Sequence, residues 1–439
     1  MIYFCRLFKY WSGARDFVCK HCAEPRSRRR RALTAVLLLS VIVTPLTFAQ
    51  SAEDTEIRTR KALTGDWWGV RSSLADNGVS FDLRYTSFYQ GLAEGTGEKG
   101  YNYGGKMDAF INLGSDKLGL WEGGEFRSHL EYSHGDATAN LGGAIFSVNT
   151  ALYWPVDTPN ELVATSLNYT QMLGDRSSIA FGKFNPVDVY ASHPFYGGWG
   201  IDRFMNIVLA APPSGLIPVV FMGALATIDV EPVTWSIIIA DPNDRTNDYF
   251  PGDLFSDGVL IAANATRVTS IAGRGSTFGI TGLYSTAEGA DYSSVGGAVG
   301  TSTKSGAYNV NIQFTHNFQE SREQSNTAWG FYLKAGIADG NPNYVQRSLI
   351  VGIAGNALFL GRPQDSFGVG AYYYDLSDTL QDELNPVLTN FQDESAFEAY
   401  YSWAVKPWLR LGANIQYINP ARGDYDNALV PSLRAQFRF

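Results

Sequence analysis

The chain has 439 residues, which is enough for two or three globular domains or for one large barrel. Its formal net charge is −9, and residues 1–49 carry nine Lys or Arg against two Asp or Glu, so the remainder has a formal charge of −16. This acidic balance argues against nucleic acid as a partner. Cys5, Cys19 and Cys22 are the three cysteines, so the chain after residue 22 has no thiol for a disulfide or a thiolate metal site.

The first 49 residues have the pattern of a secretory signal peptide. A basic run at 28–31 precedes an apolar stretch at 32–48, and the small Ala49 follows at the expected cleavage point. The stretch is too short and too one-sided to be a transmembrane helix. We therefore expect export with removal of residues 1–49, while the long segment before the basic run leaves the true translation start open. No later run reaches 18 apolar residues, so the exported chain is expected to be periplasmic, extracellular or an outer-membrane barrel.

Residues 50–78 form an N-terminal segment in which Ser72 through Asn77 favour a short helix that ends at Gly78. This segment could lie in the mouth of a barrel or pack beneath it, and the sequence does not decide between the two positions.

From residue 79 onward, apolar and polar residues alternate in short segments. The clearest case is Tyr308 to Thr315, where every second residue is apolar, and a strand places such residues on one face. We predict sixteen strands, at 79–90, 103–113, 124–134, 162–173, 177–184, 216–228, 233–240, 258–268, 275–285, 307–316, 327–337, 347–358, 366–374, 395–404, 408–418 and 431–439.

The connections between these segments are alternately long and short, which is typical of outer-membrane barrels. A soluble β-sandwich also alternates, but aromatic residues such as Tyr85, Trp403 and Phe439 recur at the ends of the apolar faces, as an interfacial girdle requires. We therefore predict an all-β fold, a 16-stranded antiparallel transmembrane β-barrel over residues 79–439, preceded by the short N-terminal helical segment.

Several motifs in chain order resemble the carbohydrate-selective porin family (OprB-type outer-membrane porins). They are Leu63–Arg71, Leu74–Val79, Phe81–Leu83, Tyr103–Asp108, Lys117–Gly124, Pro407–Pro420 and the terminal Phe439. The departures are Trp68, where the family has Gly, and Lys106, which replaces the planar fork of an Arg with a point charge. The resemblance covers about residues 63–439 and implies a sugar channel in the outer membrane of a Gram-negative bacterium.

Sixteen strands enclose a water-filled lumen, which a connection must narrow if the pore is selective. The connection Asn185 to Gly215 is long and aromatic, and it would suit a sugar ring if it folds inward; an outward loop packed on itself is the alternative. The connection Gly135 to Glu161 is the second candidate. The residues we expect to line the pore or contact sugar are Arg84, Lys106, Asp108, Arg127, His129, Glu131, Trp199, Asp202 and Arg203. Pairing of the charged ones with each other is the competing interpretation.

The function expected is passive, carbohydrate-selective diffusion of mono- and small oligosaccharides into the periplasm, without cofactor, metal or catalytic residues. An outer-membrane hydrolase, or a general or ion-conducting porin, is the alternative. The expected partners are sugars, outer-membrane lipid and lipopolysaccharide, and the outer-membrane assembly machinery, which would read Phe439. The sequence leaves open whether the barrels form homotrimers and which sugar passes.

Overall fold

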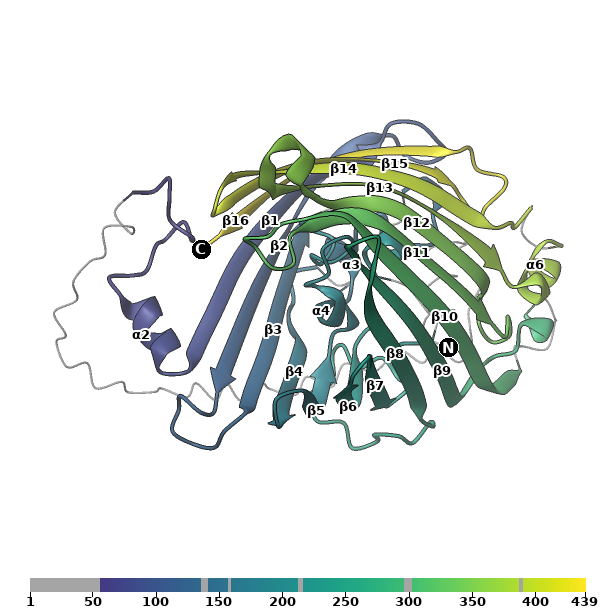
Figure 1. Ribbon diagram of the computed structural model, residues 1–439. Helices are drawn as coiled ribbons and strands as arrows, with labels where there is room; N and C mark the ends of the chain where they lie inside the picture. The colour runs from purple at the N-terminus through teal and green to yellow at the C-terminus, as the bar shows by residue number, and fades with distance from the viewer. Residues whose placement is uncertain (1–55, 136–140, 157–158, 212–215, 296–301, 387–389) are drawn as a thin grey trace.

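The computed structural model describes residues 56–135, 141–156, 159–211, 216–295, 302–386 and 390–439. Within these ranges sixteen antiparallel strands close into one barrel, with β1 paired to β16 (Figure 1). The strands are β1 (Val79–Leu92), β2 (Gly100–Gly114), β3 (Gly124–Gly135), β4 (Leu162–Leu173), β5 (Ser177–Phe184), β6 (Phe221–Val230), β7 (Val233–Ala240), β8 (Leu260–Ile271), β9 (Arg274–Ala290), β10 (Thr303–Glu320), β11 (Ala328–Ala338), β12 (Val345–Ala357), β13 (Arg362–Leu376), β14 (Glu394–Lys406), β15 (Leu409–Asn419) and β16 (Ala428–Arg438). The predicted sixteen-stranded fold is confirmed.

The remaining elements are short helices in the connections. They are α2 (Val70–Asp76), η2 (Leu141–Gly143), α3 (Thr150–Tyr153), α4 (Pro186–Tyr190), α5 (Ile207–Ala210), η3 (Tyr292–Ser294), η4 (Leu358–Leu360) and α6 (Asp378–Leu384). Among the described residues, no helix is long and apolar enough to span a membrane. The predicted signal peptide, residues 1–49, lies outside the described residues and stays a prediction.

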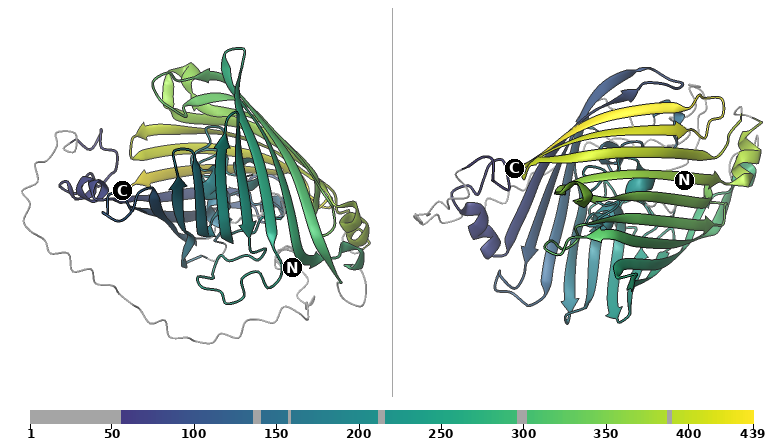
Figure 2. Two further views of the ribbon diagram at one scale, coloured as in Figure 1. Left: turned by 60° about the horizontal axis from the view of Figure 1, so that its bottom comes forward. Right: turned by 45° about the horizontal axis from the view of Figure 1, so that its top comes forward.

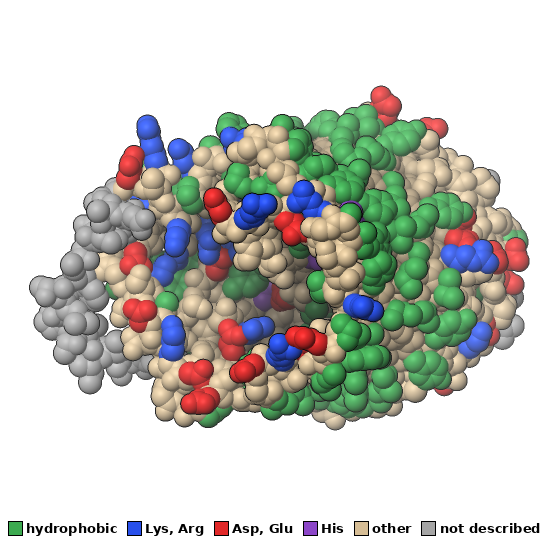
Figure 3. All heavy atoms as spheres, viewed as in Figure 1, with side chains coloured by type: hydrophobic (Ala, Val, Ile, Leu, Met, Phe, Trp, Pro, Cys, Tyr) green, Lys and Arg blue, Asp and Glu red, His purple; other side chains and the backbone are tan. Residues whose placement is uncertain are grey.

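The two faces of each strand differ in the way that the alternating sequence predicts. On β10, Ile312 is 51% exposed on the outer wall, whereas the inward Asn309 and Thr315 are buried. Figure 3 shows hydrophobic side chains over the outer wall of the barrel, while charged side chains gather around a hollow beside them. An apolar exterior around a polar interior suits a barrel in lipid, and closure of the sheet leaves no strand edge with unpaired backbone groups facing the lipid.

Several strand boundaries differ from the sequence prediction, and two of them show the physical reasons. β6 begins at Phe221 rather than at residue 216, and the apolar Val219 and Val220 before it are buried inside the barrel. β10 extends over Thr303–Glu320, beyond the predicted 307–316. Outside the lipid layer a ladder can continue without apolar alternation, so the pattern ends before the strand does.

The described parts of two long connections fold into the barrel. Connection three (residues 136–161, between β3 and β4) carries α3, and connection five (residues 185–220, between β5 and β6) carries α4; both helices lie inside the barrel in Figure 1. The hydrophobic core forms where these connections meet the inner wall on the β11–β16 side, with Phe204, Tyr332 and Tyr374 among its largest fully buried side chains. The inward position predicted for connection five is therefore observed.

Residues 56–78, the described part of the N-terminal segment, pack beneath the barrel, next to the C-terminus and opposite the end that carries α6 (Figure 2). The Leu63 backbone N–H donates to the carbonyl of Arg438 at 2.7 Å, and Arg71 Nη2 donates to the carbonyl of Phe439 at 2.6 Å. Trp67 packs on Phe81 with ring centroids 5.0 Å apart. These contacts resolve the position that the sequence left open.

Candidate functional site: the lumen constriction

Connection five bridges the lumen from the β3–β4 wall to the β14–β16 wall. Two Asn residues fix the starts of its helices, because Asn185 Oδ1 accepts from the Val187 N–H and Asn206 Oδ1 accepts from the Val208 N–H, each at 3.0 Å. Asn is a preferred N-cap, since its side chain satisfies a backbone donor that the helix itself leaves unpaired. The two caps therefore set where the intervening chain crosses the lumen.

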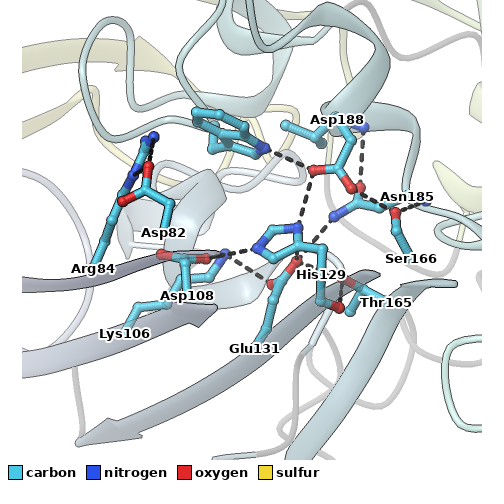
Figure 4. Close-up of polar contacts among 12 residues, drawn as sticks. Asp82, Arg84, Lys106, Asp108, His129, Glu131, Thr165, Ser166, Asn185 and Asp188 are labelled. Atoms are coloured by element: carbon cyan, nitrogen blue, oxygen red, sulfur yellow. Dashed lines mark hydrogen bonds and ion pairs between the residues drawn. The ribbon is translucent and has the colours of Figure 1, made fainter. Parts of the chain in front are cut away.

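A buried charge network holds the first end of this bridge (Figure 4). Lys106 Nζ lies 2.8 Å from Glu131 Oε2 and 3.3 Å from Asp108 Oδ1. His129 joins the network to connection five, because its Nε2 lies 3.1 Å from Asp108 Oδ1 and its Nδ1 lies 2.9 Å from Asp188 Oδ1. Exposure of these four strand residues is 1–2% (Lys106, Asp108, His129 and Glu131).

The sequence prediction counted these four residues among the candidates that line the pore or contact sugar, whereas the structure places them behind connection five. Their burial leaves no surface on which a dissolved sugar can bind. They contact one another and the loop, as the competing pairing interpretation anticipated.

Asp188 links the network to the open side of the loop. Its Oδ1 also accepts from Trp199 Nε1 at 2.7 Å, and Ser166 Oγ donates to its Oδ2. Burial raises the pKa of Asp188, but the neighbouring His129 and these hydrogen bonds outweigh burial and leave the pKa below its ordinary value. Asp188 is thus a carboxylate at neutral pH.

The same cluster includes three groups of the kind that bind metals. Ligand atoms of Asp108, His129 and Glu131 lie within 4.8 Å of one another. The ammonium of Lys106 already contacts both carboxylates, so it takes the place that a cation would occupy. We therefore propose no metal at this position.

A second group of the predicted residues borders the open lumen. Arg84 is fixed by Asp82, with Nη2 2.6 Å from Oδ2, and its guanidinium carbon lies 5.0 Å from the ring centre of Trp199. Asp202 Oδ1 lies 3.6 Å from Arg410 Nε. The side chains of Arg84 and Asp202 keep 18% and 27% of their surface exposed. Together with the half-buried Trp199, they place a flat aromatic face among charged hydrogen-bonding groups. Arg203 is also half-buried, and its charge lies near His193 and Tyr400.

Arg127 is not part of either group. It lies near the start of β3, its side chain is exposed, and its Nε donates to Glu125 Oε2 at 2.7 Å. The register pairs it with Asn112 and Asn168, towards the short-turn end of the barrel. The structure therefore separates Arg127 from the constriction.

Further along connection five, His193 packs flat on Tyr196, with ring centroids 3.7 Å apart. Burial holds the pKa of His193 well below its usual value, and the nearby positive charges of Lys334 and Arg203 lower it further. His193 is therefore neutral at physiological pH.

Comparison with known proteins identifies the family. The family model described as "Carbohydrate-selective porin, OprB family" matches residues 98–439. The chain belongs to the OprB family. Porin B of Pseudomonas aeruginosa is 22% identical over 94% of this chain and 99% of its own length.

Two solved structures of the Pseudomonas putida OprB are also similar in fold. The high-pH structure has a TM-score of 0.73 at 21% identity, and the low-pH structure has a TM-score of 0.53 at 17% identity. In each case 87% of this chain and 99% of the other chain are covered. The OprB membership places the protein in the outer membrane of a Gram-negative bacterium, as the sequence predicted, and indicates a channel rather than an enzyme.

The sequence analysis did not single out the residues of this OprB-family chain that hold the second end of connection five. Glu398 and Gln416 face inward on β14 and β15, where they pair in register and contact connections three and five. Arg434 on β16 donates from Nη1 to the carbonyl of Gly200 at 3.3 Å. Their inward direction was visible in the alternation, but the loop that they contact is remote in sequence, so no local signal marked them.

Proposed function

We propose that this porin allows passive diffusion of mono- and small oligosaccharides into the periplasm. Connection five narrows the lumen, and no cofactor or energy source is required for a solute to move down its gradient. Solutes must bind weakly, because a channel that holds its solute tightly blocks itself.

The observation that carries this proposal is the placement of the Trp199 indole beside charged groups that can form hydrogen bonds. The Arg84 guanidinium lies 5.0 Å from the indole centre, and the Asp202 carboxylate lies on the same connection. A sugar ring has apolar C–H faces and a rim of hydroxyl groups, so an aromatic face next to donors and acceptors matches both features. We propose that Arg84, Trp199, Asp202 and Arg203 contact the sugar.

The buried residues have a different proposed role. Lys106, Asp108, His129 and Glu131 position connection five through Asp188, and the solute does not reach them. Arg127, paired with Glu125, would meet a sugar only at the short-turn end of the pore.

A general porin without sugar preference is the closest alternative, because mixed charges at a constriction can also pass small ions. An outer-membrane hydrolase is the alternative from another class, and membership of a porin family favours a channel over it. Outer-membrane lipid and lipopolysaccharide are the proposed partners of the apolar outer wall, and the assembly machinery is the proposed partner of Phe439. A homotrimer is compatible with this proposal, which needs only one barrel.

Liposome swelling tests the proposal. Vesicles containing the purified protein are diluted into isotonic glucose, a disaccharide, or an uncharged non-sugar solute of similar mass. Faster swelling in glucose than in the non-sugar solute supports sugar preference. Equal swelling rates at equal mass would indicate a general porin, and no swelling together with ester or peptide cleavage would indicate a hydrolase.

A further inference from the structure

Connections three and five are joined to each other inside the barrel. The Thr150 N–H donates to the carbonyl of Met205 at 2.8 Å, and the Ile207 N–H donates to the carbonyl of Ser147 at 2.9 Å. The main chains of the two connections therefore run as one unit, and whatever fixes one of them also restrains the other.

A buried carboxylate on β14 holds this unit to the wall. Glu398 Oε1 accepts from the Met205 N–H at 2.6 Å, and Oε2 accepts from the Asn206 N–H at 2.9 Å. The Asn414 side-chain amide donates to the same carboxylate. Glu398 has no exposed surface, so its oxygens are committed to these donors. Two parallel bonds from one side chain to consecutive backbone amides fix both the position and the direction of the chain.

Two inward positions before Glu398 on β14, Glu394 has the same function for connection three. Glu394 Oε2 accepts from the Ile145 N–H at 2.7 Å, and its Oε1 accepts from the Tyr372 hydroxyl at 2.9 Å. Glu394 is also fully buried. Four residues apart on one strand, the two carboxylates thus hold both inward connections.

The barrel wall that connection five contacts has glycines on β13 where a side chain would crowd the connection. A Cβ built on Gly370 of β13 would lie 3.1 Å from Phe204 and Leu209, and one built on Gly368 would lie 2.8 Å from Phe204. Glycine therefore lets connection five approach the sheet closely enough for Glu398 to reach its backbone. The register places Gly370 directly beside Glu398.

We propose that Glu398 is the positioning residue that sets the width of the constriction, with Glu394 as its counterpart for connection three. Asp202 and Arg203, which border the open lumen, stand three and two residues before Met205, the first of the two anchored amides. A shift of that anchor moves both side chains. The inference rests on the proposed function only in treating the lumen as a pore, and it does not depend on which solute passes.

Glu398→Gln tests the inference with almost no change in size. A glutamine has one acceptor oxygen, and its NH2 group would face the second backbone N–H, so one buried donor loses its partner. We expect the folded variant to have a larger mean conductance in planar bilayers and a higher variance of the open-channel current. Glu398→Asp keeps both oxygens and should lie between the variant and the wild type.

Glu122→Gln is the matched control, because Glu122 is exposed in the short turn before β3. It should leave conductance and current variance unchanged. Heat-dependent mobility on a gel verifies that each barrel is folded. A folded Glu398→Gln protein with the conductance and variance of the wild type would overturn the inference.

If the variant does not fold, hydrogen exchange of the wild-type protein tests whether the Met205 and Asn206 amides are anchored. A peptide that contains Met205 and Asn206 should exchange at least about tenfold more slowly than an exposed loop, as buried hydrogen-bonded amides do. Exchange as fast as in an exposed loop would contradict the inference. This measurement needs no conductance, so a failure of the proposed channel function is seen separately, as absent conductance of the wild type.

Discussion

Trp199 donates its indole Nε1–H to Asp188 Oδ1 across 2.7 Å, and this bond ties the aromatic face at the lumen to the buried network behind it. His129 contacts the same oxygen at 2.9 Å from the wall side. The orientation of the proposed sugar-binding face therefore depends on charges that no sugar reaches.

Replacing Trp199 separates the flat face from the hydrogen bond. Trp199→Ala removes both, and we expect the glucose concentration for half-maximal current block to rise by roughly three- to tenfold, the size of one lost aromatic contact. Trp199→Phe keeps a flat ring and should have a smaller effect. Trp403→Phe, on the exposed outer face of β14, serves as the control and should leave the block unchanged. Equal block by wild type and Trp199→Ala would remove the indole from the proposed site.

The lowered pKa of Asp188 predicts how the constriction responds to acid. The folded-state pKa lies below the usual aspartate value of about 3.9, so the stabilising contribution is present above that value and is lost as pH falls through the folded-state pKa. We expect the difference in current noise between the wild type and Asp188→Asn to be constant from neutral pH to about pH 4 and to disappear below it. Asp188→Asn should show the higher noise already at neutral pH. Loss of that difference already near pH 6 or 7 would contradict this assignment.

Lys106 neutralises two buried carboxylates, so its removal should be costly. Lys106→Met would leave Asp108 and Glu131 without their ammonium partner, and we expect a loss of about 3–5 kcal/mol in the free energy of unfolding. Lys106→Arg keeps the charge and should cost much less. Denaturant unfolding of the detergent-solubilised barrel, followed by gel mobility, measures both. Similar stability of Lys106→Met and the wild type would exclude a neutralising role.

Arg71 connects the N-terminal segment before β1 to the C-terminal residue Phe439. It donates to the Phe439 carbonyl at 2.6 Å, and its guanidinium carbon lies 4.6 Å from the ring centre of Phe81. Arg71→Ala should lower the free energy of unfolding by about 1–3 kcal/mol through the lost hydrogen bond and packing, without a change in conductance. Arg176→Ala removes an exposed ion pair with Glu231 and should have almost no effect on stability. Equal stability of both variants would contradict a stabilising role for the contact between Arg71 and the Phe439 carbonyl.

The sixteen strands were predictable because alternation is a local property. In the eight residues from Tyr308 to Thr315, alternating apolar and polar side chains indicate which face of the strand points outward. Lipid requires an apolar outer face along every strand. The grouping of Asp108, His129 and Glu131 was also accessible, since neighbouring strands bring them together.

Burial of that group was not predictable, because it depends on Asp188, which is 59 residues from His129. An inward Glu398 looks the same in sequence whether it meets water or a folded connection. The predicted start of β6 was wrong for the same reason. The apolar residues before this strand looked like part of it, but Val220 is buried by tertiary contacts rather than by the sheet.

Titration of single-channel current with glucose tests the central claim most directly. The purified barrel in a planar bilayer should conduct ions steadily, and millimolar glucose should reduce the current in a saturable way as sugar occupies the constriction. Conductance that stays constant at every glucose concentration would contradict a carbohydrate-selective channel.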